Sequence, residues 1–222
     1  MGSYKLRRLI VVCVLLLAAA IQLASLPVSD LQLSTERINQ EDIPASLAEL
    51  PVKGRAPKTG YQRRQFGNGW ETRSGCDTRN IILARDLQEE VVDGHCRVSE
   101  GVLNDPYTGN TIHFSRSGGS NNIQIDHVVA LSDAWQKGAQ QLTYEKRVAL
   151  ANDPLNLLAV DGPTNQKKSD GDAATWLPPN KAFRCQYVER QISVKQKYAL
   201  WVTSSERDAM ARILGACTHQ SN

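Results

Sequence analysis

The sequence Ile-Asp-His-Val-Val-Ala-Leu at residues 125–131 decides the fold, together with Asp-Pro-Leu-Asn-Leu-Leu-Ala-Val-Asp-Gly-Pro-Thr-Asn-Gln-Lys-Lys at residues 153–168. Each run contains an apolar segment suited to a buried strand. Pro163 suits the first turn of a helix that follows the second strand. A path of strand, loop, strand and helix would bring the carboxylate of Asp126 and the imidazole of His127 close to amide side chains from the second run.

Together, these side chains favour hydrolysis of a phosphodiester. A neutral imidazole, here His127, can take a proton from water near neutral pH. Mg²⁺ prefers oxygen ligands and keeps several waters, so Asp126 and Asn165 are a sufficient protein contribution. Lys168 shares a helix face with Asn165 and could contact the phosphate or the leaving oxygen. Because neighbours in a strand point to opposite faces, a site that uses both Asp126 and His127 requires the strand to bend or end there.

These residues resemble the HNH, or His-Me finger, nucleases. The match lies in Asp-His-Val-Val-Ala-Leu, in the nine-residue interval from Asn156 to Asn165, and in the Asn-x-x-Lys ending at Lys168. The continuation through residues 170–180 is similar to exported bacterial HNH proteins, which are related to the C-terminal nuclease domain of GmrSD-type restriction enzymes. The resemblance covers about residues 74–217.

The resemblance implies an α+β fold with a ββα-metal core, a short antiparallel hairpin and several flanking helices. Asp126 and Asn165 would be metal ligands, for Mg²⁺ or alternatively Mn²⁺, and His127 would be the general base. Asn156 would hold the loop and the histidine by hydrogen bonds, and Lys168 would help at the phosphate. The loop between the two strands is long and helical, which departs from the family pattern and leaves substrate recognition open.

Residues 1–26 have the features of an export signal. Lys5, Arg7 and Arg8 precede an uncharged, largely apolar run over residues 9–26. The run is also about as long as the shortest membrane-spanning helix, so an anchor on the outer face of the cytoplasmic membrane is the alternative to a cleaved signal. In both cases the bulk of the chain is exported.

Charge gives little support to a nucleic-acid partner. Removing the three N-terminal cations from the 26 Lys and Arg leaves 23 basic side chains against 23 acidic ones. The basic segment at residues 51–73 suits either a phosphate partner or a solvated linker. Arg79 and Arg85 are candidate contacts to substrate phosphate, although simple solvent exposure is the default for both.

Four cysteines of the exported part fit two disulfides in an oxidising compartment. Three connectivities are open, and we favour Cys76–Cys96 with Cys185–Cys217 because these pairs join neighbouring elements. The predicted organisation is a signal or anchor at 1–26, a flexible spacer at 27–56 and an HNH nuclease domain at 57–222.

Local patterns predict the remaining elements. Strands are expected at 96–103 and 111–115, joined by a turn at 105–109, and a flexible loop at 117–122. Helices are expected in six further places: near 45–50, from Asp77 or Thr78 through Val91, over 133–139 capped by Ser132, over 144–151 capped by Thr143, over 181–200, and from the Thr203–Glu206 capping box through Leu214.

The leading hypothesis is an exported metal-dependent endonuclease that acts on DNA, with RNA left open, and has little sequence preference. The alternative is a non-catalytic, disulfide-stapled secreted module that binds nucleic acid or a surface partner. The sequence contains no Gly-x-Ser-x-Gly elbow and no His-Glu-x-x-His pair, which disfavours other hydrolases. The sequence does not distinguish a single-stranded from a double-stranded substrate.

Overall fold

The computed structural model describes residues 44–117 and 122–218. The predicted export segment, most of the predicted spacer and most of the loop expected at 117–122 lie outside the described residues. Within the described part of the chain, no helix is long and apolar enough to cross a membrane.

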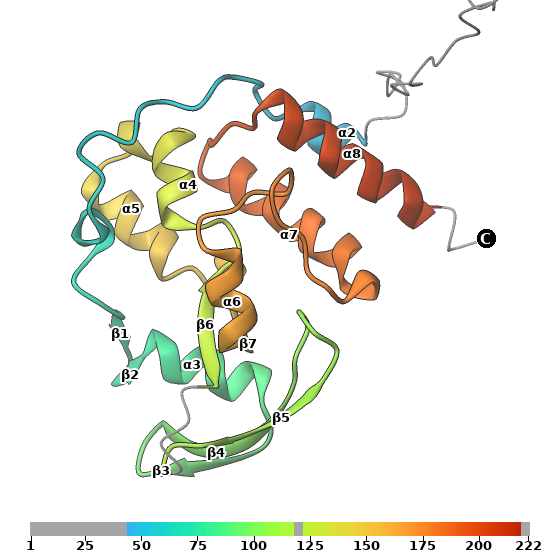
Figure 1. Cartoon of the computed structure of the whole chain (residues 1–222). Coiled ribbons are helices and arrows are strands. Elements are labelled where there is room, and N and C mark those ends of the chain that lie inside the picture. Colours follow the sequence, from blue (N-terminus) through green and yellow to red (C-terminus); the bar gives the residue numbers. More distant parts are fainter. Residues whose placement is uncertain (1–43, 118–121, 219–222) are drawn as a thin grey trace, which may run out of the picture. The chain divides into compact units, whose positions relative to one another are not determined.

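The centre of the fold is an antiparallel pair of strands followed directly by a helix (Figure 1). Strand β6 (Ile123–His127) pairs with β7 (Leu157–Asp161) in regular antiparallel register. Helix α6 (Gly162–Lys168) begins at the end of β7 and has Pro163 in its first turn. Both strands contact α6 and also α3 (Thr78–Asp86). The order of strand, strand and helix predicted from the two sequence runs is therefore present.

A three-stranded antiparallel sheet, in the order β3-β4-β5, adjoins α3. Strands β4 (Arg97–Asn104) and β5 (Thr111–Ser115) form the predicted hairpin. Strand β3 (Gln88–Asp93) was not predicted, and the expectation that the first helix runs through Val91 is wrong, because α3 ends at Asp86. All six side chains of β3 are exposed, so this segment has no apolar stripe to bury as a helix and instead pairs with β4.

Two helices connect β6 to β7. Helix α5 (Tyr144–Ala151) is capped by Thr143, as predicted. Helix α4 (Leu131–Gln136) begins two residues earlier than predicted, and Ser132 is not its cap. The Ser132 hydroxyl lies inside the first turn and donates a hydrogen bond of 3.0 Å to Asp170, so a tertiary partner replaces the expected local one.

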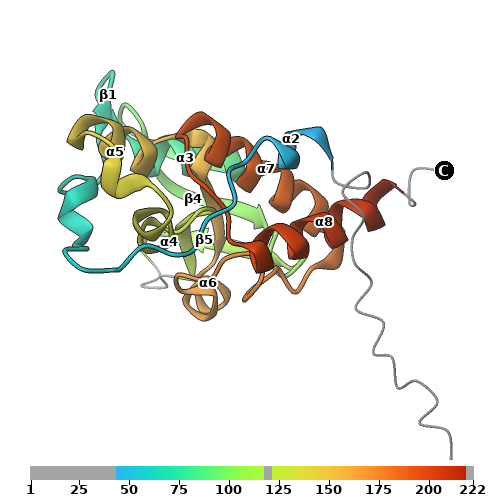
Figure 2. The same ribbon diagram turned by 90° about the horizontal axis from the view of Figure 1, so that it is seen from above.

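The C-terminal helices α7 (Arg184–Lys197) and α8 (Ser204–Thr218) pack against each other and against the short helix α2 (Ala45–Ala48) (Figures 1 and 2). The predicted capping box is confirmed. The hydroxyl of Thr203 accepts a hydrogen bond of 3.2 Å from the backbone N–H of Glu206, and the Glu206 carboxylate accepts one of 3.4 Å from the backbone N–H of Thr203.

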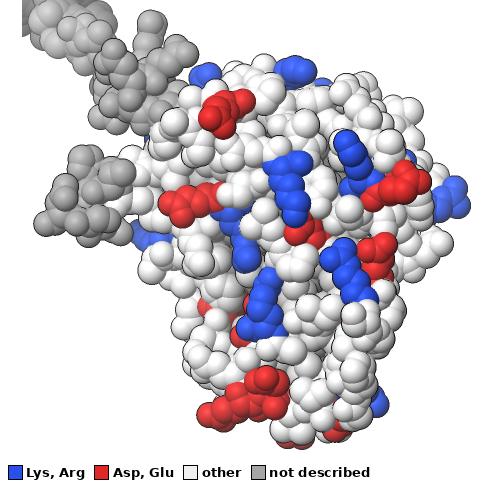
Figure 3. All heavy atoms as spheres, turned by 180° about the vertical axis from the view of Figure 1, so that it is seen from behind, with Lys and Arg blue, Asp and Glu red and all other residues white. Residues whose placement is uncertain are grey.

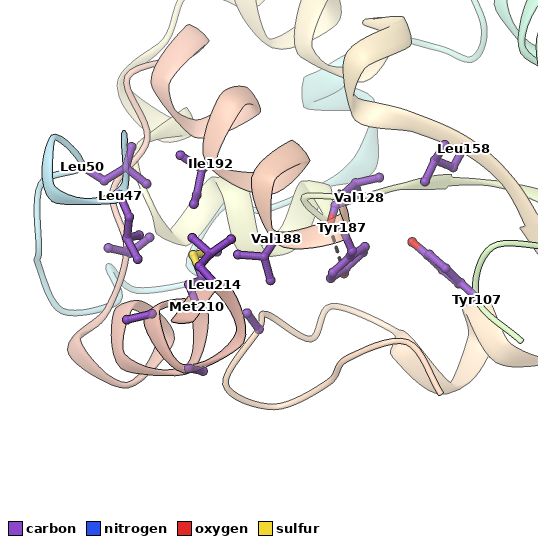
Figure 4. Packing of buried hydrophobic residues seen from close by; sticks show 14 of the residues in the cluster. Leu47, Leu50, Tyr107, Val128, Leu158, Tyr187, Val188, Ile192, Met210 and Leu214 are labelled. Atoms are coloured by element: carbon purple, nitrogen blue, oxygen red, sulfur yellow. Dashed lines mark hydrogen bonds between the residues drawn. The ribbon is translucent and has the colours of Figure 1, made fainter. Parts of the chain in front are cut away.

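An apolar cluster forms where these helices meet the end of the β6–β7 pair (Figure 4). Leu47 and Leu50 are buried in this cluster, at 0% and 4% exposure. Residues 44–50, the first described part of the predicted spacer, therefore pack on the domain. The cluster also contains, among others, Tyr107, Val128, Leu158, Tyr187, Val188, Ile192, Met210 and Leu214.

Residues 51–59 form an extended strap that leads from α2 past α4 (Figure 2). The strap is bound through its backbone. Val202 donates a 3.0 Å hydrogen bond to Pro51 and accepts one of the same length from Lys53. Ala56 donates one of 2.8 Å to Gln136.

Shorter elements complete the described chain, and both disulfides have the favoured connectivity. Cys76 is bonded to Cys96 and Cys185 to Cys217. The short elements are η2 (Arg63–Phe66), β1 (Thr72–Arg73), β2 (Cys76–Asp77), η3 (Ala139–Gln141), η4 (Pro154–Asn156) and η5 (Lys181–Phe183).

A buried charge cluster joins the strap, α4, the segment after α6, and both C-terminal helices. At its centre, the ammonium of Lys137 lies 2.8 Å from Asp133, 2.7 Å from Asp172 and 2.7 Å from Glu206. Lys137 and Glu206 are completely buried. Burial opposes ionisation of Asp172, but Lys137 and Arg55 outweigh it and lower the pKa of Asp172 to about 2. The cluster contains three cations and three anions, namely Arg55, Lys137, Lys195, Asp133, Asp172 and Glu206.

The substitution Lys137→Met tests this cluster. Removing the central cation leaves the three acids with only Arg55 and Lys195, so one buried negative charge is uncompensated and we expect the free energy of unfolding to fall by about 3–5 kcal/mol. Urea denaturation followed by circular dichroism measures the loss. The matched control is Lys181→Met at an exposed lysine, which should change stability by less than about 0.5 kcal/mol. Equal losses in the two variants would show that the cluster adds nothing specific.

Candidate active site

A cleft of about 550 Å³ is lined by β6, the start of α4 and α6. Four residues of the predicted site line it, and so do two further cations. The predicted residues are Asp126, His127, Asn165 and Arg79, and the further cations are Lys58 and Arg63.

Asp126 is held rigidly at the edge of the cleft, with 6% of its surface exposed. Its Oδ2 accepts a 2.5 Å hydrogen bond from the hydroxyl of Tyr107, and its Oδ1 accepts one of 3.0 Å from the ammonium of Lys168. Burial raises the pKa of Asp126, whereas the charge of Lys168 and both hydrogen bonds favour the carboxylate. The two donors therefore fix the orientation of the carboxylate and counter the cost of burying it.

Tyr107 forms a contact with the site that the sequence did not predict. It lies in the turn predicted at 105–109, yet it is completely buried and packs against Trp176 and Tyr187. Burial raises the pKa of Tyr107 well above its ordinary value, so the hydroxyl remains a donor to Asp126. The turn sequence indicated the local conformation, but no spacing rule shows that a turn tyrosine points into the core.

Lys168 lies at the end of α6 and is 2% exposed. Besides Asp126, its ammonium donates a 2.9 Å hydrogen bond to the backbone oxygen of His127. It is not among the residues that line the cleft. The structure thus places Lys168 behind Asp126, and its expected role at the phosphate stays a prediction.

His127 is buried at the last position of β6 and is among the residues that line the cleft. Its Nε2 lies 2.9 Å from the backbone oxygen of Ala151, and its ring stacks on Trp70 at a centroid distance of 5.8 Å and an angle of 13°. Because a carbonyl oxygen only accepts, Nε2 carries the proton, and Nδ1 of the neutral ring is an unprotonated acceptor. Burial lowers the pKa of His127 to about 3, so the neutral ring is the form present near pH 7.

Asn156 holds the point where the chain leaves β6. It is completely buried. Its backbone oxygen accepts from Val128, and its side-chain oxygen accepts from the backbone of Val129, each at 2.8 Å. The asparagine therefore binds the backbone N–H groups of the two residues that follow His127, where β6 and its pairing with β7 end. The strand thus ends at His127, one of the two conditions predicted from the sequence, and both Asp126 and His127 line the cleft.

Asn165, in α6, also faces the cleft. Its amide nitrogen donates a 2.9 Å hydrogen bond to Gln124, which orients the side chain. The carboxylate of Asp126 and the amide oxygen of Asn165 are hard donors suited to Mg²⁺ or Mn²⁺. No group of three or more His, Cys, Asp or Glu side chains in the described residues could hold a metal ion. Asp126 and Asn165 supply two oxygen donors, and both Asp126 oxygens already accept hydrogen bonds, from Tyr107 and from Lys168.

Arg79 and Arg85, both predicted as substrate contacts, have different environments. Arg79 lines the cleft, and burial together with the neighbouring charge of Arg116 lowers its pKa. Arg85 does not line the cleft and donates 2.7 Å hydrogen bonds to the backbone oxygens of Pro154 and Leu157, which hold α3 against β7. Cations and acids are interspersed on the face shown in Figure 3, in line with the 23 basic and 23 acidic side chains that follow residue 26.

The buried neutral His127 predicts a specific pH dependence of stability. An unfolded His127 takes up a proton near pH 6.5, whereas the folded ring does so only near pH 3. Between these values the unfolded state binds more protons, so the free energy of unfolding should fall as pH decreases from about 6.5. Urea midpoints at pH 7 and pH 4 should differ less in His127→Ala than in the wild type. His113→Ala, at an exposed histidine on β5, should retain the wild-type difference, and the same loss in both variants would contradict the assignment.

Comparison with known proteins places the chain in a family. Residues 78–213 match the family described as GmrSD restriction endonucleases, C-terminal domain. A relative from Arthroderma benhamiae (strain ATCC MYA-4681 / CBS 112371), named "Uncharacterized secreted protein", is 39% identical over 174 residues, which are 77% of this chain and 82% of the relative. This relative does not show the bacterial origin that the resemblance suggested. No solved structure matches the chain. The chain thus belongs to the family of the C-terminal domain of GmrSD restriction endonucleases.

Proposed function

We propose that this protein is an exported, metal-dependent endonuclease that hydrolyses phosphodiester bonds of DNA or RNA with little sequence preference. The observation that carries the proposal is the convergence of Asp126, His127 and Asn165 on one cleft in a domain of a restriction-endonuclease family. The relative named as secreted and the two disulfides support an oxidising, extracellular location.

His127 is the general base in this proposal. With Nε2 donating to Ala151, the lone pair of Nδ1 can accept a proton from the attacking water. A base with a pKa near 3 is weak at neutral pH. A phosphodiester in the cleft brings negative charge close to the ring, favours the imidazolium form and raises the pKa of His127. Substrate binding would therefore increase the basicity of the ring.

Asp126 and Asn165 would hold the metal ion, and Asn156 fixes the turn that presents the histidine. When bound, a divalent cation polarises the phosphate and stabilises the developing negative charge. Lys168 and Tyr107 keep the Asp126 carboxylate in one orientation. The strand pair, α6 and this set of side chains together support a ββα-metal core of the His-Me finger type.

The decisive experiment incubates the protein lacking residues 1–26 with plasmid DNA and with RNA in Mg²⁺ or Mn²⁺. We expect cleavage that stops when EDTA is added. His127→Ala should lower the rate by roughly 100- to 10,000-fold, the usual contribution of a positioned base. His113→Ala, at an exposed histidine outside the cleft, should retain wild-type activity.

Two results would count against the proposal. An active His127→Ala variant would remove the general base assignment. Salt-sensitive, metal-independent binding of nucleic acid without any turnover would instead favour the non-catalytic secreted module.

A further inference from the structure

A second cavity, of about 240 Å³, adjoins the cleft. The two cavities share four lining residues, Arg63, Trp70, His127 and Leu131. A molecule with its phosphate in the cleft can therefore extend another group into this space without leaving the protein surface.

The walls of the second cavity are aromatic and apolar. Phe66 and Leu131 are buried at 2% and 5% exposure, and Trp70 is partly buried with one face against His127. The loop that closes the cavity contributes Gly67 and Gly69, with φ of +100° and +131°. A Cβ at Gly69 would meet nothing within 4 Å, so the glycine leaves this wall open.

The size and chemistry of the cavity suit a planar ring. An apolar cavity of about 150 Å³ is enough to bind benzene, so this larger space can take a heteroaromatic base. Arg63 stands where the two cavities meet and is exposed, and no acid among the described residues pairs with it. Its guanidinium is suited to a phosphate group.

We propose that this cavity binds the nucleobase next to the scissile phosphate, and that the substrate is therefore single-stranded or locally unpaired nucleic acid. This inference rests on the proposed endonuclease function. A base within a duplex is stacked and paired and would have to be extruded before it entered the cavity. Stacking on an aromatic ring is tolerant of base identity, in keeping with little sequence preference.

The test compares single-stranded DNA oligonucleotides with and without one abasic site, together with the matching duplex. We expect cleavage next to the abasic site to be roughly 5- to 150-fold slower than at the same bond in the intact strand, the range for base–aromatic stacking. The intact duplex should also be cut more slowly than the single strand. Trp70→Ala should slow cleavage of the intact strand to a similar degree without slowing the abasic strand further.

The control is Trp201→Phe, because Trp201 lines neither cavity. This variant should cut the intact strand faster than the abasic strand by the same factor as the wild type. Equal slowing of the intact and abasic strands by Trp70→Ala would overturn the proposal, since Trp70 would then act only by orienting His127. A duplex cut as fast as the single strand would overturn it as well.

A binding measurement separates failure of this inference from failure of the proposed function. Tryptophan fluorescence is titrated with a nucleoside monophosphate in EDTA, for the wild type and for Trp70→Phe. If the wild type cuts no nucleic acid but its fluorescence is quenched through Trp70, the base pocket is supported and the nuclease function is wrong. If there is neither cleavage nor quenching, both proposals are wrong. If the wild type cuts the intact and the abasic strand at the same rate, the nuclease function is supported and the base pocket is wrong.

Discussion

The site depends on the buried ion pair between Asp126 and Lys168. A carboxylate at the end of a buried strand would be protonated or displaced without a cation, because burial disfavours its charged form. Lys168 supplies this cation from the last turn of α6 and also binds the backbone oxygen of His127. One ammonium therefore links the end of β6 to α6 and holds the Asp126 carboxylate in place.

In the buried charge cluster, too, buried acids are held by buried cations, here farther from the cleft. Lys137 draws together acids from three separate parts of the chain, and Arg55 brings the strap into the same network. The strap in turn presents Lys58, which pairs with Asp170 at 3.0 Å and lines the cleft. The buried charge cluster thus anchors the strap that carries Lys58 to the cleft.

Local features of the fold were predictable because their causes are local. Thr143 caps α5 through its own hydroxyl, Pro163 occupies a first helical turn, and the Thr203–Glu206 box closes within one turn. The helix cap assigned to Ser132 failed because that hydroxyl bonds to a residue far along the chain. At Ser132 a tertiary hydrogen bond outweighs the local preference for a helix cap. Its partner, Asp170, lies too far along the chain to be found from the neighbouring sequence.

Some residues of the candidate site could be predicted from the sequence and others could not. The spacing of the two sequence runs and the resemblance to HNH nucleases pointed to Asp126, His127 and Asn165, and all three line one cleft. Tyr107 and Trp70 could not be found by spacing, since their contacts with Asp126 and His127 arise only from packing between separate elements.

The distribution of charge around the cleft also limits how substrate can bind. Lys58 is already paired with Asp170, and of the other two cations that line the cleft, Arg63 forms no ion pair within the described residues and Arg79 interacts with the charge of Asp77. Two cations neutralise about two phosphates, far fewer than the roughly 6–10 contacts typical of strong electrostatic binding to DNA. In the proposed nuclease, affinity for nucleic acid would then draw mainly on contacts other than charge, and the aromatic-walled cavity beside His127 is the feature of this site suited to provide them.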